Sequence, residues 1–288
     1  MSNMEEQFYQ LIGKTFRITG PKGQMYCDDR ALSAFRTDSS CADHDIEIKI
    51  VDELSQPEGE LIFTEPARRI YRNGETQIRY EGSVETSLDG AYLRIARQGD
   101  HSAVQVERKS ILEGITTKIV LNSLEAEHHI AQNNGFLLHA SYIRVKDQAI
   151  LFTAPSGTGK STQADLWCSL RDAELLNGDR AAVMAEPGGV VVRGVPFAGS
   201  SNVCKNVVLP LSGIVYLSQA PQTSIERLTG LRAFWYVWEG CSVNVWNRQD
   251  VDQCTQTVMD VVQRVPVFHL ACTPDESAVI ALERALNL

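Results

Sequence analysis

Hydrophobic and polar residues alternate over short stretches through roughly the first 132 residues of the chain. A period of two predicts half-buried strands, because successive side chains of a strand point to opposite faces of its sheet. Turn-forming pairs separate these stretches. The pair Asn73-Gly74 predicts a tight hairpin, since both residues accept a positive φ. The predicted strands cover residues 15–19, 46–51, 69–72, 77–80, 91–96 and 103–106.

The apolar spacing changes to three and four residues between about 116 and 132, which predicts a helix. The turn-forming run Asn133-Asn134-Gly135 follows this helix and is typical of a domain boundary. We therefore expect a β-rich domain over residues 1–132, with a role in substrate recognition or assembly, and a second domain over residues 133–288.

Strand-like and helical patterns alternate in the second domain. A hairpin is predicted over 136–153, and the run 214–217 is apolar throughout, as in strands buried on both faces. The last predicted helix opens with Thr273 as N-cap, Pro274 at the first helical position and Glu276 as the capping glutamate. The other predicted strands are 173–176, 181–184 and 190–192, and the other predicted helices are 162–170, 229–239 and 249–264. This order predicts an α/β domain, and an α+β chain overall.

Residues 154–162, Ala-Pro-Ser-Gly-Thr-Gly-Lys-Ser-Thr, match the phosphate-binding loop (P-loop, or Walker A motif) of nucleotide-binding proteins. In this motif the glycines allow a tight turn whose backbone N–H groups face phosphate, the lysine reaches the β- and γ-phosphates, and the serine offers its hydroxyl to Mg²⁺. Ala154 replaces the usual first glycine, which a negative φ permits. A predicted strand before the loop and a helix after it favour anion binding. The expected nucleotide contacts are Ser156, Gly157, Thr158, Gly159, Lys160, Ser161 and Thr162.

Two residues outside the loop are candidates for the chemistry. Asp179 follows a short apolar strand, and ligands of α/β sheets gather where strands end, so we expect Asp179 to meet Ser161 at a metal ion. His139 lies within an apolar strand, where a hydrogen-bonded core histidine is the alternative. Arg193 and Lys205 flank a glycine-rich segment and are weaker candidates for neutralising transferred charge; a plain turn is the alternative there.

Composition narrows the function classes. The 288 residues carry a net charge of −9, which argues against broad electrostatic binding to nucleic acid or to acidic membranes. The amino terminus resembles no signal peptide, and no apolar run reaches the roughly 18 residues of a membrane span. The seven cysteines show no zinc or redox spacing. We expect a cytoplasmic protein with reduced thiols.

The second domain resembles the catalytic domain of the HPr kinase/phosphorylase family, whose nucleotide-binding core is similar to that of the phosphoenolpyruvate carboxykinases. The matching pieces, in order, are Leu138-His139, residues 155–161, Asn177-Gly178-Asp179-Arg180 and Val192-Arg193-Gly194. They lie within residues 136–288, about half of the chain. The resemblance implies a P-loop kinase domain that transfers the γ-phosphoryl group of ATP, with Mg²⁺, to a serine hydroxyl.

The same resemblance implies roles for individual residues. Lys160 would contact phosphate, Ser161 and Asp179 would bind the metal, and Asp179 and His139 would act near the acceptor. The family has two aspartates before the arginine, where this chain has Gly178 and Asp179, and a metal-binding glutamate where this chain has Val192 or its neighbour. With one carboxylate left, His139 is the available partner of Asp179.

We therefore expect an ATP- and Mg²⁺-dependent kinase whose acceptor is a serine of a small protein or peptide. Two alternatives remain open: a nucleotide-sensing module that binds peptides without phosphoryl transfer, and a kinase of a small molecule such as an amino acid or sugar. The family tends to assemble into rings, so a homo-oligomer is expected. The helix 229–239 places four apolar residues on one side, as a core face or a contact between subunits: Leu231, Phe234, Trp235 and Trp238.

Overall fold

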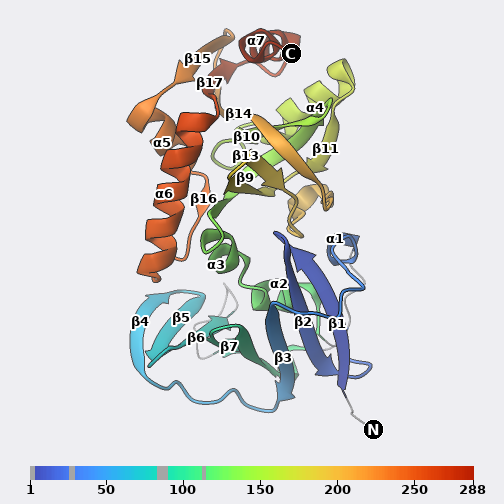
Figure 1. Cartoon of the computed structure of the whole chain (residues 1–288), viewed down its shortest axis with the longest axis vertical. Helices are drawn as coiled ribbons and strands as arrows, with labels where there is room; N and C mark the ends of the chain where they lie inside the picture. Colours follow the sequence, from blue (N-terminus) through green and yellow to red (C-terminus); the bar gives the residue numbers. More distant parts are fainter. Residues whose placement is uncertain (1–3, 26–29, 83–89, 112–114) are drawn as a thin grey trace. The chain divides into compact units, whose positions relative to one another are not determined.

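The computed structural model describes residues 4–25, 30–82, 90–111 and 115–288. About 27% of the chain is helix and 44% is strand, so the protein belongs to the mixed α+β class. It divides into two compact units, Met1–Ala126 and Glu127–Leu288 (Figure 1). The division falls within the segment for which the sequence predicted a single helix.

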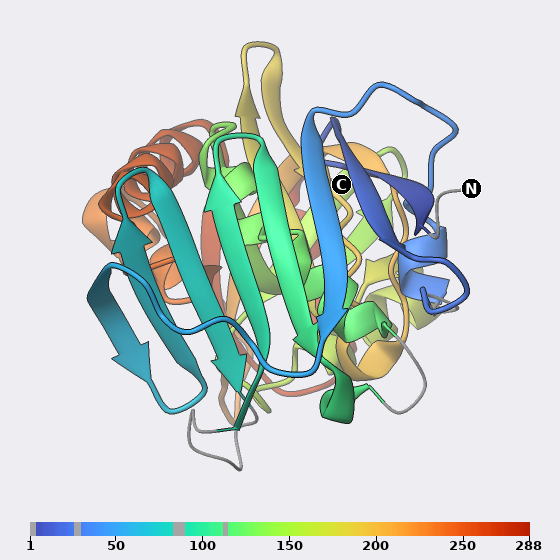
Figure 2. The ribbon, with the colours of Figure 1, turned by 90° about the horizontal axis from the view of Figure 1, so that it is seen from below.

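The first unit is built on one eight-stranded sheet, seen face on in Figure 2. Its strand order is β1-β2-β3-β8-β7-β6-β5-β4, and only β2–β3 and β3–β8 are parallel pairs. All six predicted strands are confirmed; β1 and β4 were not predicted. The bounds are β1 Met4–Leu11, β2 Lys14–Pro21, β3 His44–Val51, β4 Glu60–Glu65, β5 Arg68–Asn73, β6 Thr76–Gly82, β7 Ala91–Gln98 and β8 His101–Glu107.

The alternation along β3 explains why the predictions for this sheet succeed. Ile46 and Ile48 are buried, whereas Glu47 and Lys49 between and after them are not. The hairpin that joins β5 and β6 also forms as predicted, with Gly74 at φ +58°.

The predicted helix over 116–132 is wrong as a single element. The structure has two helices there, α2 Thr117–Ser123 and α3 Ala126–Ala131, in addition to the short α1 Arg30–Ser33. They are separated at Glu125, whose φ of +43° interrupts the helical backbone. The Glu125 carboxylate is 2% exposed and forms ion pairs with Arg97 at 3.1 Å and with Arg79 at 3.9 Å. These buried pairs hold the break in place.

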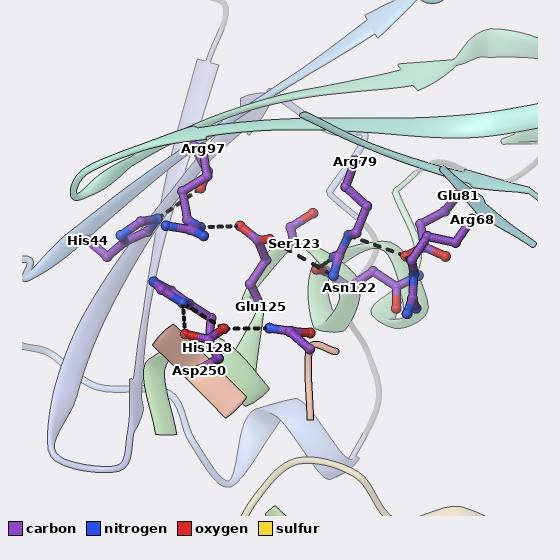
Figure 3. Close-up of polar contacts among 12 residues, drawn as sticks. His44, Arg68, Arg79, Glu81, Arg97, Asn122, Ser123, Glu125, His128 and Asp250 are labelled. Atoms are coloured by element: carbon purple, nitrogen blue, oxygen red, sulfur yellow. Dashed lines mark hydrogen bonds and ion pairs between the residues drawn. The ribbon is translucent and has the colours of Figure 1, made fainter. Parts of the chain in front are cut away.

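Figure 3 shows how the sheet of the first unit contacts α2 through charged groups. The guanidinium of Arg79 donates to the carbonyl of Asn122 and pairs with Glu81, which also pairs with Arg68. In the second unit, the buried carboxylate of Asp250 accepts hydrogen bonds from the Nδ1 of His128 and from the side-chain amides of Gln132 and Asn244. The first cluster joins α2 to β6, and the second joins the segment of His128 and Gln132 to Asp250.

The second unit is built on a nine-stranded sheet with the path β10-β9-β12-β13-β14-β17-β15. β14 also pairs with β10, so the pairings β10-β9-β12-β13-β14 close on themselves. β11 and β16 pair with β9. The bounds are β9 Gly135–Val145, β10 Gln148–Thr153, β11 Glu174–Asn177, β12 Arg180–Glu186, β13 Gly189–Arg193, β14 Val208–Gln219, β15 Ser224–Leu228, β16 Cys241–Ser242 and β17 Val267–Cys272.

Helices cover both faces of the three adjacent parallel strands β10, β14 and β17. Ile150 and Phe152 of β10 pack in the core shared with α4 and α7, whereas Leu151 packs in the core shared with α5 and α6. Strands covered on both faces are apolar throughout, as the sequence predicted for β14. The helices are α4 Lys160–Arg171, α5 Gly230–Trp238, α6 Arg248–Arg264 and α7 Glu276–Leu286.

Two details of this unit differ from the predictions. The N-cap of α7 is Asp275, whose carboxylate accepts from the N–H of Ser277 at 2.8 Å; Thr273 instead donates its hydroxyl to Asp275. On α5 the expected apolar side is divided, because Leu231 and Trp235 are exposed. The strands β15, β16 and β17 were not predicted. Among the described residues, no helix has the length and apolarity to cross a membrane.

Candidate active site

The predicted phosphate loop connects the end of β10 to the start of α4. Gly157 has a φ of +78° and Gly159 a φ of +124°, values that side chains rarely adopt, whereas Ala154 is not among the positive-φ residues. A Cβ atom added to either glycine would meet nothing within 4 Å. Backbone conformation therefore requires the two glycines, and the space beside the loop is open to a ligand.

Lys160 opens α4, and its side chain returns to the loop. It is 8% exposed, and its Nζ donates to the carbonyls of Ala154 at 3.1 Å and Pro155 at 3.4 Å. Burial lowers the pKa of this amino group, and the charge of Asp179 acts in the opposite direction. Neutral carbonyls thus hold the ammonium group beside the loop. Asp179 is the acidic group whose charge raises its pKa.

His139 and Asp179 are brought together by strand pairing. His139 of β9 pairs in register with Arg180 of β12, and its Nε2 lies 3.6 Å from the Oδ1 of Asp179. Backbone bonds fix the position of the histidine: its N–H donates to the carbonyl of Gly240, and its carbonyl accepts from the hydroxyl of Thr153. The histidine is therefore placed beside the last residue of β10.

The pKa of His139 is lowered below the ordinary histidine value of 6.5. Burial is the largest cause, followed by the positive charge of Lys160, while Asp179 raises the pKa and Arg180 lowers it. A lowered pKa favours the neutral imidazole, which can accept a proton. The charged groups near the ring are Asp179, Lys160 and Arg180, so its surroundings are not purely apolar.

Asn177 positions Asp179, a role that the sequence did not predict. Its buried side chain accepts from the N–H groups of Asp179 at 2.8 Å and Arg180 at 3.0 Å, and donates to the carbonyl of Val195 at 3.0 Å. The sequence could have indicated this role, because Asn177 lies two residues before Asp179 and asparagine side chains commonly accept from the backbone N–H two residues later.

The backbone around Gly178 is closely packed. A Cβ atom at Gly178 would lie 2.4 Å from the hydroxyl oxygen of Ser201, and one at Gly199 would lie 2.7 Å from the Cβ of Asp179. The segment that contains Gly199 and Ser201 thus packs directly on the Asp179 turn. A second aspartate has no room at 178. At the other departure from the family pattern, Val192 is fully buried in the apolar core.

The two weaker candidates, Arg193 and Lys205, form ion pairs with carboxylates outside the candidate site. Arg193 pairs with Glu186 at 2.7 Å, and Lys205 pairs with Glu174. Neither residue lines the cavities beside the loop. The cation next to Asp179 is Arg180, at 3.4 Å, which also donates to the hydroxyl of Ser242. The sequence signal for Arg180 was its place next to the candidate acid.

A cavity lies on each side of the phosphate loop. The first, of about 610 Å³, is bounded by Gly157–Gly159 and by the chain that follows β14 and β17. The second, of about 500 Å³, is bounded by Ala154–Ser156 and contains His139 and Asp179. Thr162 lines the first cavity, whereas Ser161 is exposed in the first turn of α4 and lines neither. The second cavity is completed by Thr153, Arg180, Tyr216 and Glu239–Ser242.

No protein-family model matches the sequence, and no curated protein matches it. Among solved structures, the chain is similar to the HPr(Ser) kinase/phosphatase from Coxiella burnetii, with a TM-score of 0.29 and 11% sequence identity. The similarity covers 52% of this chain and 88% of that one. At this distance the likeness carries no weight for function.

Proposed function

We propose that this protein is an ATP- and Mg²⁺-dependent kinase that phosphorylates a serine hydroxyl of a small protein or peptide. One observation carries the proposal: the phosphate loop separates two cavities, and the second holds the neighbouring side chains of His139 and Asp179. A nucleotide in the first cavity and an acceptor hydroxyl in the second would then meet across the loop. Transfer of this kind depends mainly on positioning and on charge stabilisation.

The loop fits a triphosphate. Positive φ at Gly157 and Gly159 turns the backbone around an open space, and α4 begins immediately afterwards with no side chain capping its first N–H groups. Free N–H groups at a helix start attract anions. Lys160 adds a cation at the same place.

A magnesium ion at this site would be held largely by phosphate and water, because Ser161 lies outside both cavities and Asp179 lies in the second. Among the described residues, no three His, Cys, Asp or Glu side chains form a group that could hold a metal by themselves. Magnesium in nucleotide sites takes only one or two protein ligands besides phosphates and water. Ser161 and Asp179 would supply those ligands, and the ion would neutralise charge on the phosphates.

The side chains of the second cavity would handle the acceptor. Asp179 would take the proton of the acceptor hydroxyl as its oxygen forms a bond to the γ-phosphorus and ADP leaves. Asn177 fixes the backbone of Asp179, and Arg180 pairs with its carboxylate at 3.4 Å. The neutral ring of His139, 3.6 Å away, would relay or share the proton.

Two alternatives each have one supporting observation. Asp179 is already paired with Arg180, and no second acid fits at Gly178, which favours a module that binds nucleotide without transfer. The second cavity, at about 500 Å³, has the size of typical small-molecule sites, which favours a free amino acid or sugar as acceptor.

Labelled ATP separates these functions. The protein would be incubated with γ-labelled ATP, Mg²⁺ and either serine-containing peptides or free amino acids and sugars, and the label followed into product. Lys160→Met should reduce transfer on the order of 10³-fold, because a charge that stabilises the transferred group is lost. Lys22→Met, at an exposed position of the first unit, is the matched control. Nucleotide binding without any transfer would favour the binding module.

A further inference from the structure

The polar side chains of the first cavity are mostly engaged with one another or with the chain. The hydroxyl of Ser218 is 2.8 Å from the Nε2 of His269, and the side-chain amide of Gln219 donates to the carbonyl of Thr158 at 3.3 Å. Thr273 donates to Asp275. Leu217, Ala220, Pro221 and Pro274 give this cavity apolar walls.

Gln163 differs from these residues. It is 2% exposed on the first turn of α4, and its Nε2 donates to the Sγ of Cys272 at 3.4 Å. Its Oε1 is buried and has no hydrogen-bond partner among the described residues. Leaving a buried acceptor unpaired costs about 1–3 kcal/mol, so a ligand that donates to it recovers that free energy.

The environment favours one kind of donor. Apolar walls together with one buried, unpaired acceptor suit a flat ring system that carries an amino group. The amide nitrogen of Gln163 is already directed at the Cys272 sulfur, which leaves its carbonyl oxygen for the ligand.

The geometry points to Gln163 as the residue that selects adenine, by accepting a hydrogen bond from the exocyclic amino group of the base. This inference rests on the proposed function and adds the nucleotide preference to it. Guanine and hypoxanthine carry an acceptor where adenine carries its amino group, so they would face the Gln163 carbonyl without a hydrogen bond. A site with a buried partner rejects analogues that lack the matching group.

The test compares the binding of ATP, ITP and inorganic tripolyphosphate by calorimetry with Mg²⁺ present. Tripolyphosphate has no base and reports on the phosphate loop alone. The wild-type protein should bind ATP roughly tenfold more tightly than ITP, as expected for one buried hydrogen bond. Gln163→Met should bring the two affinities together, mainly by weakening ATP, and leave tripolyphosphate unchanged. Gln256→Met, at an exposed position of α6, is the matched control and should keep the wild-type preference.

Several results would overturn the inference while the proposed function stands. One is equal binding of ATP and ITP by the wild-type protein, which needs no variant to fold. Another is an ATP preference that persists in Gln163→Met. A third is a Gln163-dependent loss of affinity for 2′-deoxy-ATP, which would assign the carbonyl to the ribose. If neither tripolyphosphate nor any nucleotide binds, the proposed function fails, and the inference with it.

Discussion

The two units of this protein place charged side chains in contrasting ways. In the first unit, Arg79, Glu81 and Glu125 are nearly buried, and each has an oppositely charged partner. In the second unit, Lys160 is equally buried, yet neutral carbonyls are its hydrogen-bond partners, and His139 lies between charges of both signs.

The difference distinguishes charges that are paired with opposite charges from charges that are held by neutral groups beside a cavity. A buried pair whose partners satisfy each other holds elements together and is costly to break. A charge held by neutral groups beside a cavity remains available to a ligand. Substitutions in the first unit should therefore change stability, and those around the loop should change binding and transfer.

The largest effect is expected at Asp179. Asp179→Asn keeps the shape of the side chain but removes the carboxylate that would accept the hydroxyl proton. Transfer should fall on the order of 10³-fold, equivalent to about 4 kcal/mol, because the base and one proposed metal ligand are lost together, while metal-free ATP binding through the phosphate loop is retained. Single-turnover transfer and calorimetry would measure the two quantities. Full activity in this variant would remove Asp179 from the mechanism.

Breaking a buried ion pair in the first unit should lower the free energy of unfolding by nearly as many kcal/mol. Glu125→Gln leaves Arg97 and Arg79 with an uncharged partner, so the first unit should lose roughly 3–4 kcal/mol. Hydrogen exchange of the amides in β7 and β8 would report the loss. Glu75→Gln, at an exposed position of the same unit, is the control. An unchanged exchange rate would show that the buried pair is dispensable.

Acid should weaken the first unit through His44. Burial lowers the pKa of this histidine to about 4, below its ordinary value of 6.5. The unfolded chain therefore binds more protons between these values, so stability is full above pH 6.5 and falls toward pH 4, by up to about 3 kcal/mol. Hydrogen exchange of β3 at pH 6.5 and pH 4 would measure the change. His44→Gln should make the dependence shallower, and an identical slope would contradict the assignment.

The smallest effect concerns His139. Because Asp179 raises its pKa and Lys160 lowers it, Asp179→Asn should move the pKa further down and Lys160→Met should move it up. NMR titration of the ring would follow both shifts. In the wild-type protein, the loss of transfer on acidification should begin below pH 6.5, since the neutral ring persists there. Shifts of the opposite sign would exclude this electrostatic arrangement.

Local patterns predicted much of the fold. Alternation identified six strands of the first sheet, and Gly157 and Gly159 have the positive φ values expected of a tight glycine turn. The prediction failed where contacts distant in sequence decide the outcome. The helix breaks at Glu125 because Arg97, on β7, pairs with its carboxylate. β15 became a strand by pairing with β17, which lies about forty residues later.

The candidate site residues could be named from the sequence, whereas their arrangement could not. Lys160, Asp179 and His139 could be named from motif and spacing, and the structure brings their side chains within electrostatic reach of one another. Arg193 and Lys205 were chosen by proximity in sequence, whereas their own acidic partners, Glu186 and Glu174, keep them elsewhere. These ion-pair partners become apparent only in the folded structure.

The contact between Gly178 and Ser201 has an evolutionary consequence. A side chain introduced at 178 alone would collide with the serine, so a larger residue there requires Ser201 to move or to become smaller as well. The two positions should therefore constrain each other during evolution, and paired substitutions at 178 and 201 should be tolerated where a single change at 178 is not.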